Sequence, residues 1–414
     1  MAINLEQATS KVLDNISLVK SERINLKSAD HRILAEDITA PIDLPPFTYS
    51  SFDGYAFNAQ DTSSASPANP IFMEVVADIP GGSFLSEKIP RGTCAKIMTG
   101  APVPEGANAV VPQEDIQEPE QNRILIEQPY FPKQNLITKG TYIKSQEPVM
   151  PKGTCLQAGQ IQLLASLGIS EVKVFKKPVV GIFATGSELA PLGDSLGKAQ
   201  IYDSNSSMLN VMVNKNLGKG QVFPPVPDKM NELKQTTTWA LKTCDMVIST
   251  GGIGRGDHDL MPEVIKDLNS EILFQGINTK PGASTLVALK NNQLIFCLTG
   301  SPGAAALIFD QLVRPALLRK AGIIHYQRPY GEALLEHKIS INKEKKQDSV
   351  QPLFFMNCFI RNGDLFARKA SMGNHPKESF LGEPNAVFQP KTERDSINQG
   401  ERIWVELIDL PEVK

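Results

Sequence analysis

The chain has 414 residues, a formal net charge of −3 at pH 7 and a hydrophobic content of 41%. This length predicts two to four domains, and the charge balance gives no basic footprint for nucleic acid. No apolar run reaches the ~18 residues that a membrane-spanning helix needs, and the N-terminal segment lacks the pattern of a secretion signal. Five scattered cysteines predict buried reduced thiols. We therefore expect a cytoplasmic protein that binds neither nucleic acid nor membrane.

The first 177 residues change pattern more than once. Apolar residues recur with a helical period between residues 5 and 19, whereas three prolines between residues 41 and 46 exclude a regular helix. Residues 70–130 alternate short strand-like runs with glycine and proline, which predicts a small β-rich domain. A further helix is predicted over 158–167.

From residue 178 to about residue 322 the predicted strands and helices alternate. The strands are expected at 179–184, 220–223, 245–249 and 294–298, and the helices at 205–216, 228–242, 261–268 and 303–320. This alternation predicts a doubly wound, mostly parallel sheet. Residues 328–414 return to short strands with turns, which predicts a small β-barrel or sandwich. The expected fold class is therefore multidomain α/β.

Glycines and acidic residues follow two of the predicted strands. The strand at 245–249 leads into Gly251-Gly252-Ile253-Gly254-Arg255-Gly256-Asp257-His258-Asp259, and the strand at 179–184 leads into Thr185-Gly186-Ser187-Glu188. Ligands bind at the carboxyl ends of strands in open α/β sheets, and glycine lets the backbone approach them closely. The acids suit a phosphate bridged by a metal ion. These loops predict a phosphorylated ligand, although neither is a Walker A or Rossmann motif.

Each acidic motif also has a plain structural interpretation when it is read alone. Asp53 before glycine is typical of a turn, and Thr99 belongs to a strand that ends in a tight turn. Asp228 stands where the next helix needs an N-cap, and Asp257 or Asp259 could equally cap the helix after the glycine loop. Glu188 could be a first-turn acid that a helix dipole stabilises. No one motif decides between structure and function.

Eight sequence words follow one another along the chain. They are Asp53-Gly54-Tyr55-Ala56, residues 98–104, residues 106–111 with Gln113-Glu114, residues 165–169, Thr185-Gly186 with Glu188-Leu189, Ile201-Tyr202-Asp203-Ser204-Asn205, Gly251-Gly252 with Gly256 and Asp259, and Lys280-Pro281-Gly282. In this order the words resemble the molybdopterin molybdenumtransferase family, which includes the bacterial MoeA proteins and the gephyrin E domain. The resemblance covers essentially the whole chain.

The resemblance implies an elongated molecule with four parts. A discontinuous N-terminal linker domain would comprise residues 1–40 and 140–177, and a β-rich insert domain would comprise 41–139. An α/β molybdopterin-binding domain would follow at 178–323, and a C-terminal β domain at 324–414. It also implies a homodimer, with the active cleft formed between one subunit's α/β domain and the partner's insert. Contacts with other molybdenum cofactor synthesis proteins and with apo-molybdoenzymes are further implied partners.

The family reaction inserts molybdate into the dithiolene of adenylylated molybdopterin and releases AMP. By this resemblance Asp228 and Asp259 would bind a magnesium ion, which would polarise the P–O bond. Asp53 and Thr99 would reach in from the partner subunit, and Glu188 would complete the acidic edge. These five residues are the expected catalytic set.

The expected binding set consists mainly of loop residues. Their backbone N–H groups would cradle the pterin and the phosphates, and Lys280 would supply a point charge for molybdate or phosphate. The set is Thr185, Gly186, Ser187, Gly251, Gly252, Gly256, Lys280, Gly300, Ser301 and Pro302.

Several positions depart from the family pattern. Residues 140–142 lack two expected acids, Gly254 stands where a serine is expected, and Ala283 stands near the place of a second lysine. Residues 375–378 replace an expected anion-binding loop.

Two classes of function therefore remain open. The first is an active transferase in which Arg255, His258 or Lys377 replaces the lost charge. The second is a molybdopterin-binding paralogue or partner protein that no longer transfers the metal. The five acidic and hydroxyl residues of the expected catalytic set are all retained, and this favours the enzyme.

Overall fold

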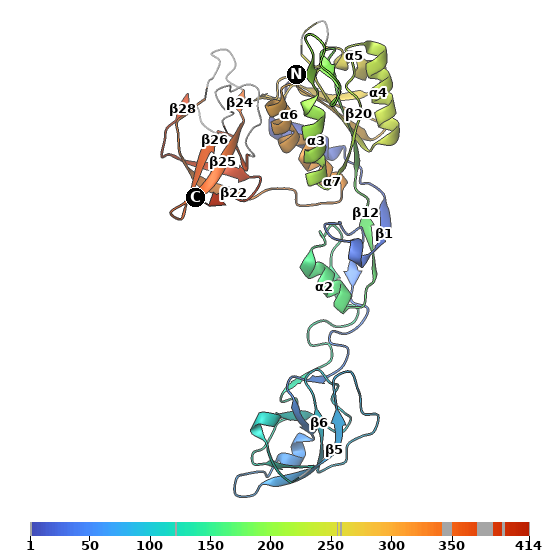
Figure 1. Ribbon diagram of the computed structural model, residues 1–414, viewed down its shortest axis with the longest axis vertical. Coiled ribbons are helices and arrows are strands. Elements are labelled where there is room, and N and C mark those ends of the chain that lie inside the picture. The colour runs from blue at the N-terminus through green and yellow to red at the C-terminus, as the bar shows by residue number, and fades with distance from the viewer. Residues whose placement is uncertain are drawn as a thin grey trace.

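The protein is elongated, with a chain that runs from an upper body to a lower body and back (Figure 1). This computed structural model describes residues 2–120, 122–254, 256, 259–341, 350–370, 384–390 and 394–413. The upper body consists of an α/β unit with a C-terminal β-barrel beside it, and a narrow waist joins it to a β-rich lower body. No helix among the described residues is both long and apolar enough to cross a membrane.

The N-terminal helix belongs to the upper body. Helix α1, Leu5–Asp14, begins with a capping box in which the Asn4 side chain accepts from the N–H of Gln7. Its apolar side, which includes the fully buried Ala8 and Val12, packs into the core of the α/β unit. The expected helical period over residues 5–19 is thus an amphipathic helix that ends at residue 14, because Asn15 already has non-helical backbone angles.

The waist is made of two chain segments that run in opposite directions. Strand β1, Ser21–Asn25, pairs antiparallel with β12, Glu171–Phe175, over five residue pairs. Below them α2, Ala158–Ser166, packs on a small core that includes Leu34 and Leu156. The remaining waist elements are the 3-10 turn Leu26–Ser28, β2 at Ile38–Thr39 and β11 at Pro148–Met150, of which β2 and β11 pair with each other.

The lower body is an open, half-barrel sheet with the strand order β7-β4-β6-β5-β9-β8. The strands are β4 Gly54–Phe57, β5 Ile71–Ile79, β6 Thr93–Ile97, β7 Ala109–Pro112, β8 Gln117–Glu120 and β9 Arg123–Ile126. A second pair of strands, β3 Tyr49–Ser50 and β10 Leu136–Ile137, connects it to the waist. The short 3-10 turns are Ala59–Thr62 and Gln113–Asp115.

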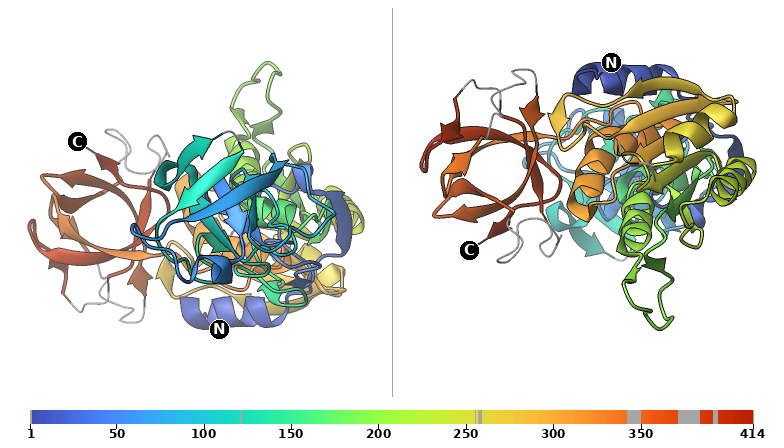
Figure 2. Two further views of the ribbon diagram at one scale, coloured as in Figure 1. Left: turned by 90° about the horizontal axis from the view of Figure 1, so that it is seen from below. Right: turned by 90° about the horizontal axis from the view of Figure 1, so that it is seen from above.

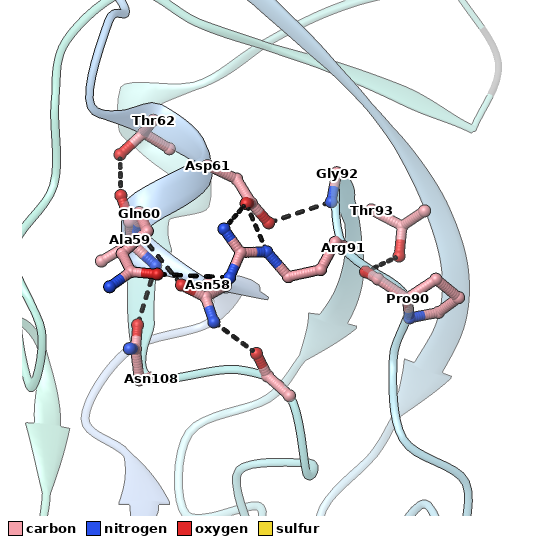
Figure 3. A network of polar contacts seen from close by, with 11 residues as sticks. Asn58, Ala59, Gln60, Asp61, Thr62, Pro90, Arg91, Gly92, Thr93 and Asn108 are labelled. Carbon is pink, nitrogen blue, oxygen red and sulfur yellow. Dashed lines mark hydrogen bonds and ion pairs between the residues drawn. The ribbon is translucent and has the colours of Figure 1, made fainter.

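A polar network fastens the 3-10 turn at residues 59–62 to the loop before β6 (Figure 3). The Asp61 carboxylate accepts from Nε of Arg91 at 2.7 Å and from the N–H of Gly92 at 2.9 Å. Asn58 caps the turn through the N–H of Gln60 and also donates to the Gly106 carbonyl. All of these bonds stay within the lower body, so we assign the network a structural role.

The α/β unit has a six-stranded sheet with the order β16-β13-β17-β21-β20-β18. The first four strands are parallel, and the last two are antiparallel additions. The strands are β13 Val179–Ala184, β16 Lys219–Val222, β17 Met246–Thr250, β18 Glu271–Gln275, β20 Leu286–Lys290 and β21 Gln293–Leu298. The predicted mostly parallel sheet is confirmed, but β18 and β20 were not predicted.

Helices cover both faces of this sheet. The core on one face includes residues of α1, α3, α6 and α7, and the core on the other face includes residues of α4 and α5. The bounds are α3 Ser204–Lys215, α4 Met230–Thr243, α5 Met261–Asp267, α6 Pro302–Ile308 and α7 Arg314–Lys320. The predicted helix at 303–320 is interrupted by a π-helical turn, Phe309–Val313. Pro315 follows this turn, and because proline has no N–H it removes one bond of the regular helical ladder.

The π-helical turn also anchors the C-terminal barrel. Asp310 in the turn is buried and accepts from Arg328 at 2.5 Å, while Arg314 donates to the Tyr326 carbonyl and faces Glu406 of the barrel. Burial and the neighbouring charge of Arg328 lower the pKa of Arg314. Because each buried charge has an opposite partner, the network ties the barrel to the helix.

Five strands of the C-terminal part close into a barrel in the order β26-β22-β29-β27-β25, with β25 pairing back to β26 (Figure 2). They are β22 Tyr330–Leu335, β25 Phe354–Arg361, β26 Asp364–Lys369, β27 Ala386–Phe388 and β29 Arg402–Leu407. Strand β30, Glu412–Val413, pairs parallel with β25. The minor pairs are β23 Ile339–Ser340 with β28 Ser396–Ile397, and β19 Thr279–Lys280 with β24 Gln351–Pro352. The sequence predicted a small barrel or a sandwich, and the structure has the barrel.

Candidate functional site

A pocket of about 310 Å³ lies where β13, β17 and β21 end. Parallel strands bring their carboxyl ends to one edge of the sheet, so the loops that follow them meet there. Three loops contribute Thr185 and Gly186, Gly251 and Gly252, and Gly300 with Pro302. The two glycine loops that the sequence singled out are thus brought together, and the loop after β21 joins them.

Asp228 is the best-anchored acid of the pocket. Its Oδ1 accepts from the Thr185 hydroxyl at 2.6 Å, and its Oδ2 accepts from the N–H of Ser187 at 3.1 Å. The Ser187 hydroxyl in turn accepts from the N–H of Asp228. The capping interpretation of Asp228 is wrong, because α4 begins later with Lys229 at its N-cap. The Asp228 side chain points instead to the loop after β13.

Asp259 is held by its own glycine loop. Its Oδ2 accepts from the N–H of Gly256 at 2.7 Å. The N-cap of α5 is Leu260, without a side-chain capping bond, so the capping interpretation of Asp259 is also wrong. Asp259 instead faces the pocket. Asp257, the alternative capping residue, lies outside the described residues.

Glu188 lies at the mouth of the pocket. It precedes the short strand β14, Leu189–Ala190, and not a helix, so its interpretation as a first-turn acid is wrong. Strand β14 pairs parallel with β15, Ile201–Tyr202, and the loop between them projects from the body (Figure 2). The Glu188 carboxylate lies over Gly186, where an added Cβ would meet Oε1 at 2.6 Å.

The glycines of these loops leave space for side chains and backbone of the protein itself. An added Cβ would lie 2.6 Å from Asp259 Oδ2 at Gly254, and 2.4 Å from the Thr185 carbonyl oxygen at Gly251, where φ is +90°. These glycines make room for a carboxylate and for the close approach of two loops. Glycine at 254 is therefore consistent with the position that Asp259 takes in this chain.

Most of the backbone N–H groups that were expected to cradle the ligand already have partners. Thr185 donates to the Thr250 carbonyl, Gly186 to Val226 and Gly251 to Leu298. The prediction fails for these three residues because the parallel strand pairing continues into the loops. Within the described part of the chain, no bond uses the N–H of Gly252 or Gly300, and these two remain free to donate to a ligand.

Four of the expected binding residues, Ser187, Gly256, Lys280 and Ser301, are not among the residues that line this pocket. Lys280 is exposed in the short strand β19, and Ser301 is the N-cap of α6. Ser187 and Gly256 act indirectly, since their N–H groups orient Asp228 and Asp259. Arg255, His258 and Lys377, the candidate replacements for lost charge, lie outside the described residues.

The start of α3 contributes site residues whose roles sequence reasoning missed. Tyr202, Asp203 and Asn205 line the pocket. Asp203 caps α3 through the N–H of Ser206 at 3.0 Å, and Asn205 donates to the Gly300 carbonyl at 2.9 Å. Their sequence word, Ile201 to Asn205, lies directly before a predicted helix, and this position is the signal that indicates the ligand edge.

Asp53 and Thr99 lie in the lower body and do not reach the pocket of the same chain. Asp53 precedes β4, and β4 pairs with β6, the strand that leads to Thr99 (Figure 1). Oδ1 of Asp53 accepts from the N–H and from the hydroxyl of Thr99, each at 2.7 Å. These bonds hold the pKa of the Asp53 carboxyl below its ordinary value of 3.8.

The charge of the pocket determines which ligands suit it. Four carboxylates line it, and no lysine, arginine or histidine does so among the described residues. The four acids are Glu188, Asp203, Asp228 and Asp259. Because they are negatively charged, they would repel a phosphate unless a cation stood between them and it.

The described residues form no cluster of three or more side chains with metal-ligand geometry. Magnesium is commonly bound by one or two carboxylates together with substrate phosphates, and not by an all-protein cage. Asp228 and Asp259 supply two such carboxylates, each oriented by backbone N–H groups. Their hard oxygen donors are of the kind that a magnesium ion takes, and substrate phosphates would have to complete its coordination.

Comparison with known proteins gives one consistent result. Residues 3–168 match the model of the MoeA N-terminal region (domain I and II), and residues 181–319 match that of the probable molybdopterin binding domain. The molybdopterin molybdenumtransferase of Staphylococcus aureus (strain Mu50 / ATCC 700699) is 34% identical over 322 residues, which is 78% of this chain and 77% of that protein. That of Staphylococcus epidermidis (strain ATCC 12228 / FDA PCI 1200) is 34% identical over 320 residues, covering 77% and 76%.

Solved structures agree with the sequence comparisons. Two structures of the molybdopterin biosynthesis MoeA protein from Pyrococcus horikoshii superpose with TM-scores of 0.88 and 0.79 at 31% and 30% identity. They cover 99% and 98% of this chain and all of each matched chain. The similarity therefore extends over both bodies and the barrel.

Proposed function

Because this chain belongs to the molybdopterin molybdenumtransferase family, we propose that it inserts molybdate into the dithiolene of adenylylated molybdopterin and releases AMP. The site is the pocket at the ends of β13, β17 and β21. The observation that carries the proposal is the convergence there of Glu188, Asp228 and Asp259 with the loops of Thr185 and Gly251. This arrangement suits a phosphoanhydride bridged to carboxylates by a cation.

Asp228 and Asp259 would hold a magnesium ion against the phosphoanhydride. When bound, the ion would polarise the P–O bond and neutralise charge that develops on the phosphate oxygens. Thr185 and Ser187 keep Asp228 in place through the hydroxyl and N–H bonds at 2.6 and 3.1 Å. Gly252 and Gly300 offer N–H groups to the phosphates.

A second copy of the chain would complete the site in a homodimer. Asp53 and Thr99 have donor and acceptor groups at the surface of the lower body, and they do not line the pocket of the α/β unit of their own chain. The neighbouring Phe52 is 46% exposed, and Ile201 at the pocket mouth is 58% exposed. Apolar surface beside each half supports contact between a partner's lower body and this pocket.

The proposed reaction also requires partners before and after it. Adenylylated molybdopterin would come from another molybdenum cofactor synthesis protein, and the finished cofactor would pass to apo-molybdoenzymes. We include contacts with both classes in the proposal.

The alternative is a protein that binds molybdopterin without transferring the metal. One observation favours it, namely that none of the described residues lining the pocket carries a positive charge and that Lys280 does not line it. Such a site would retain the pterin and phosphate contacts but bind the molybdate oxyanion weakly.

One assay separates the two functions. Purified protein is incubated with adenylylated molybdopterin, magnesium and increasing molybdate, and both AMP release and reconstitution of an apo-molybdoenzyme are measured. We expect AMP release that depends on molybdate and that Asp259→Ala abolishes. Tight binding of the adenylylated pterin without turnover at any molybdate concentration would establish the binding protein instead. Absence of binding at tens of micromolar would contradict both.

A further inference from the structure

Asn205 is buried beside the ligand pocket with half of its amide unused. It lies in the first turn of α3, lines the pocket and is only 7% exposed. Its Nδ2 donates to the Gly300 carbonyl at 2.9 Å and to the Thr250 hydroxyl at 3.4 Å. Since a carbonyl can only accept, these contacts determine which end of the amide is nitrogen. Oδ1 is left without a hydrogen-bond partner.

Nothing nearby in the described structure supplies a donor for Oδ1. The buried hydroxyls of Ser206 and Ser249 make no hydrogen bond to it. The acids that line the pocket are acceptors when ionised and have no hydrogen to give. A buried acceptor without a partner is unfavourable, so a ligand that brings an N–H group into the pocket would relieve this cost.

We propose that Oδ1 of Asn205 accepts a hydrogen bond from a ring amino group of the substrate, which makes Asn205 a specificity-determining residue. This inference rests on the proposed function. Adenylylated molybdopterin has one such group on each half, the 6-amino group of adenine and the 2-amino group of the pterin. The two share one chemistry, an N–H donor conjugated to an aromatic ring. A site built to bond such a group discriminates against an analogue without it.

The position of Asn205 also explains why an asparagine is suitable there. Nδ2 holds the loop after β21 through the Gly300 carbonyl, and within the described residues the N–H of Gly300 makes no bond. Oδ1 is at the same time buried without a hydrogen-bond partner. An aspartate would keep the acceptor but would face the Gly300 carbonyl with a second oxygen, and a leucine would lose both bonds. The Asn205 side chain would thereby both hold the Gly300 loop in place and select the ligand.

The test measures binding of matched probes by calorimetry in the presence of magnesium. One pair is AMP and purine riboside 5′-monophosphate, which lacks the 6-amino group. The other pair is neopterin monophosphate and its analogue without the 2-amino group. Each probe is titrated into the wild-type protein, into Asn205→Ala and into Asn210→Ala. Asn210 is a matched control on the same helix, and it contacts Asn214 and not the pocket.

We expect the wild-type protein to bind the amino-bearing member of one pair about tenfold more tightly than its analogue. Asn205→Ala should remove this preference by weakening only the amino-bearing probe, and Asn210→Ala should retain it. The pair that shows the preference identifies the half of the substrate that Asn205 contacts.

Two results would overturn the inference while leaving the proposed function intact. Equal binding of both members of each pair by the wild-type protein would do so without any variant, and therefore does not depend on whether Asn205→Ala folds. A uniform loss of all probes in Asn205→Ala would assign Asn205 only to holding the Gly300 loop. Failure of the wild-type protein to bind any probe would contradict the proposed function itself.

Discussion

Two aspartates in opposite bodies of the molecule are held in the same way. In the upper body Asp228 accepts from the Thr185 hydroxyl at 2.6 Å and from a backbone N–H at 3.1 Å. In the lower body Asp53 accepts from the Thr99 hydroxyl and N–H, each at 2.7 Å. Asp228 shares a pocket of about 310 Å³ with three other acids. Asp53 lies in the lower body and is not among the residues that line this pocket.

This difference indicates what each body can do alone. The upper body brings acids and loops with free N–H groups together in one pocket, which suits a ligand. The lower body has a well-oriented carboxylate, Asp53, which lies outside that pocket. The lower body would therefore contribute to chemistry only when placed against another surface.

The largest expected effect comes from removing the upper aspartate. Asp228→Ala should lower the rate of molybdate-dependent AMP release about a hundredfold or more, because a preorganised charge that binds the cation is lost. The measurement is the single-turnover rate at saturating magnesium. Asp194→Ala, on the projecting loop, is the control and should keep the wild-type rate. A comparable loss in both variants would mean that the pocket is not the reaction site.

Mixed dimers test whether the lower body of one subunit serves the upper body of the other. Asp53→Ala and Asp228→Ala should each be inactive alone. Co-assembly in equal amounts should restore about a quarter of the wild-type rate, because half of the dimers are mixed and each mixed dimer has one intact site. The readout is AMP release after separation of the dimer fraction. No recovery in verified mixed dimers would place Asp53 outside a shared site.

Gly251 tests the close packing of the upper loops. Gly251→Ala should lower the free energy of unfolding by about 3 kcal/mol, because a positive φ and a clash with the Thr185 carbonyl combine. Gly82→Ala in the lower body is the matched control. It has a similar φ of +82° with open space around it, and should cost only about 1 kcal/mol. Urea unfolding gives both values, and equal losses would show that the loop at Gly251 can relax.

The smallest expected effect is a titration in the lower body. Thr99→Val removes the hydroxyl donor but keeps the N–H, so the pKa of Asp53 should rise toward its ordinary value of 3.8. A lowered folded-state pKa contributes stability above the ordinary pKa, and this is lost as pH falls through the lowered value. In the variant, the contribution of Asp53 to the stability of the fold should therefore be lost at a higher pH than in the wild-type protein. NMR titration of the carboxyl carbon measures the shift, with Thr93→Val as a control that should leave it unchanged.

Much of the fold could be predicted from the sequence because its signals are local. Strands such as β13 and β17 are continuous apolar runs, and each is followed by glycine and polar residues. The hairpin between β20 and β21 was missed, although Asn291 and Asn292, both with positive φ, are typical of its turn. The hairpin breaks the alternation of strands and helices that predicted the rest of this domain, and its turn signal spans only two residues.

The residues of the candidate site could be predicted, but their local contacts could not. Asp228 read alone suggested a helix cap, because local rules see only the residues that follow it, and only the family resemblance implied a role as a metal ligand. Its actual partners, Thr185 and Ser187, lie more than forty positions earlier in the chain, and only the folded sheet brings them near. The same holds for Asn205, whose unused acceptor becomes visible only when Gly300 and Thr250 are in place.

The waist passes two strands side by side, and this constrains how the protein can change in length over evolution. The pairing of β1 with β12 sets residue against residue from Ser21 with Phe175 to Asn25 with Glu171. Loss of one residue from one strand would turn every following side chain to the opposite face. Insertions and deletions there are tolerable only as matched changes on both strands. The distance between the two bodies can therefore change only when β1 and β12 change in length together, whereas the loops of the lower body can gain or lose single residues.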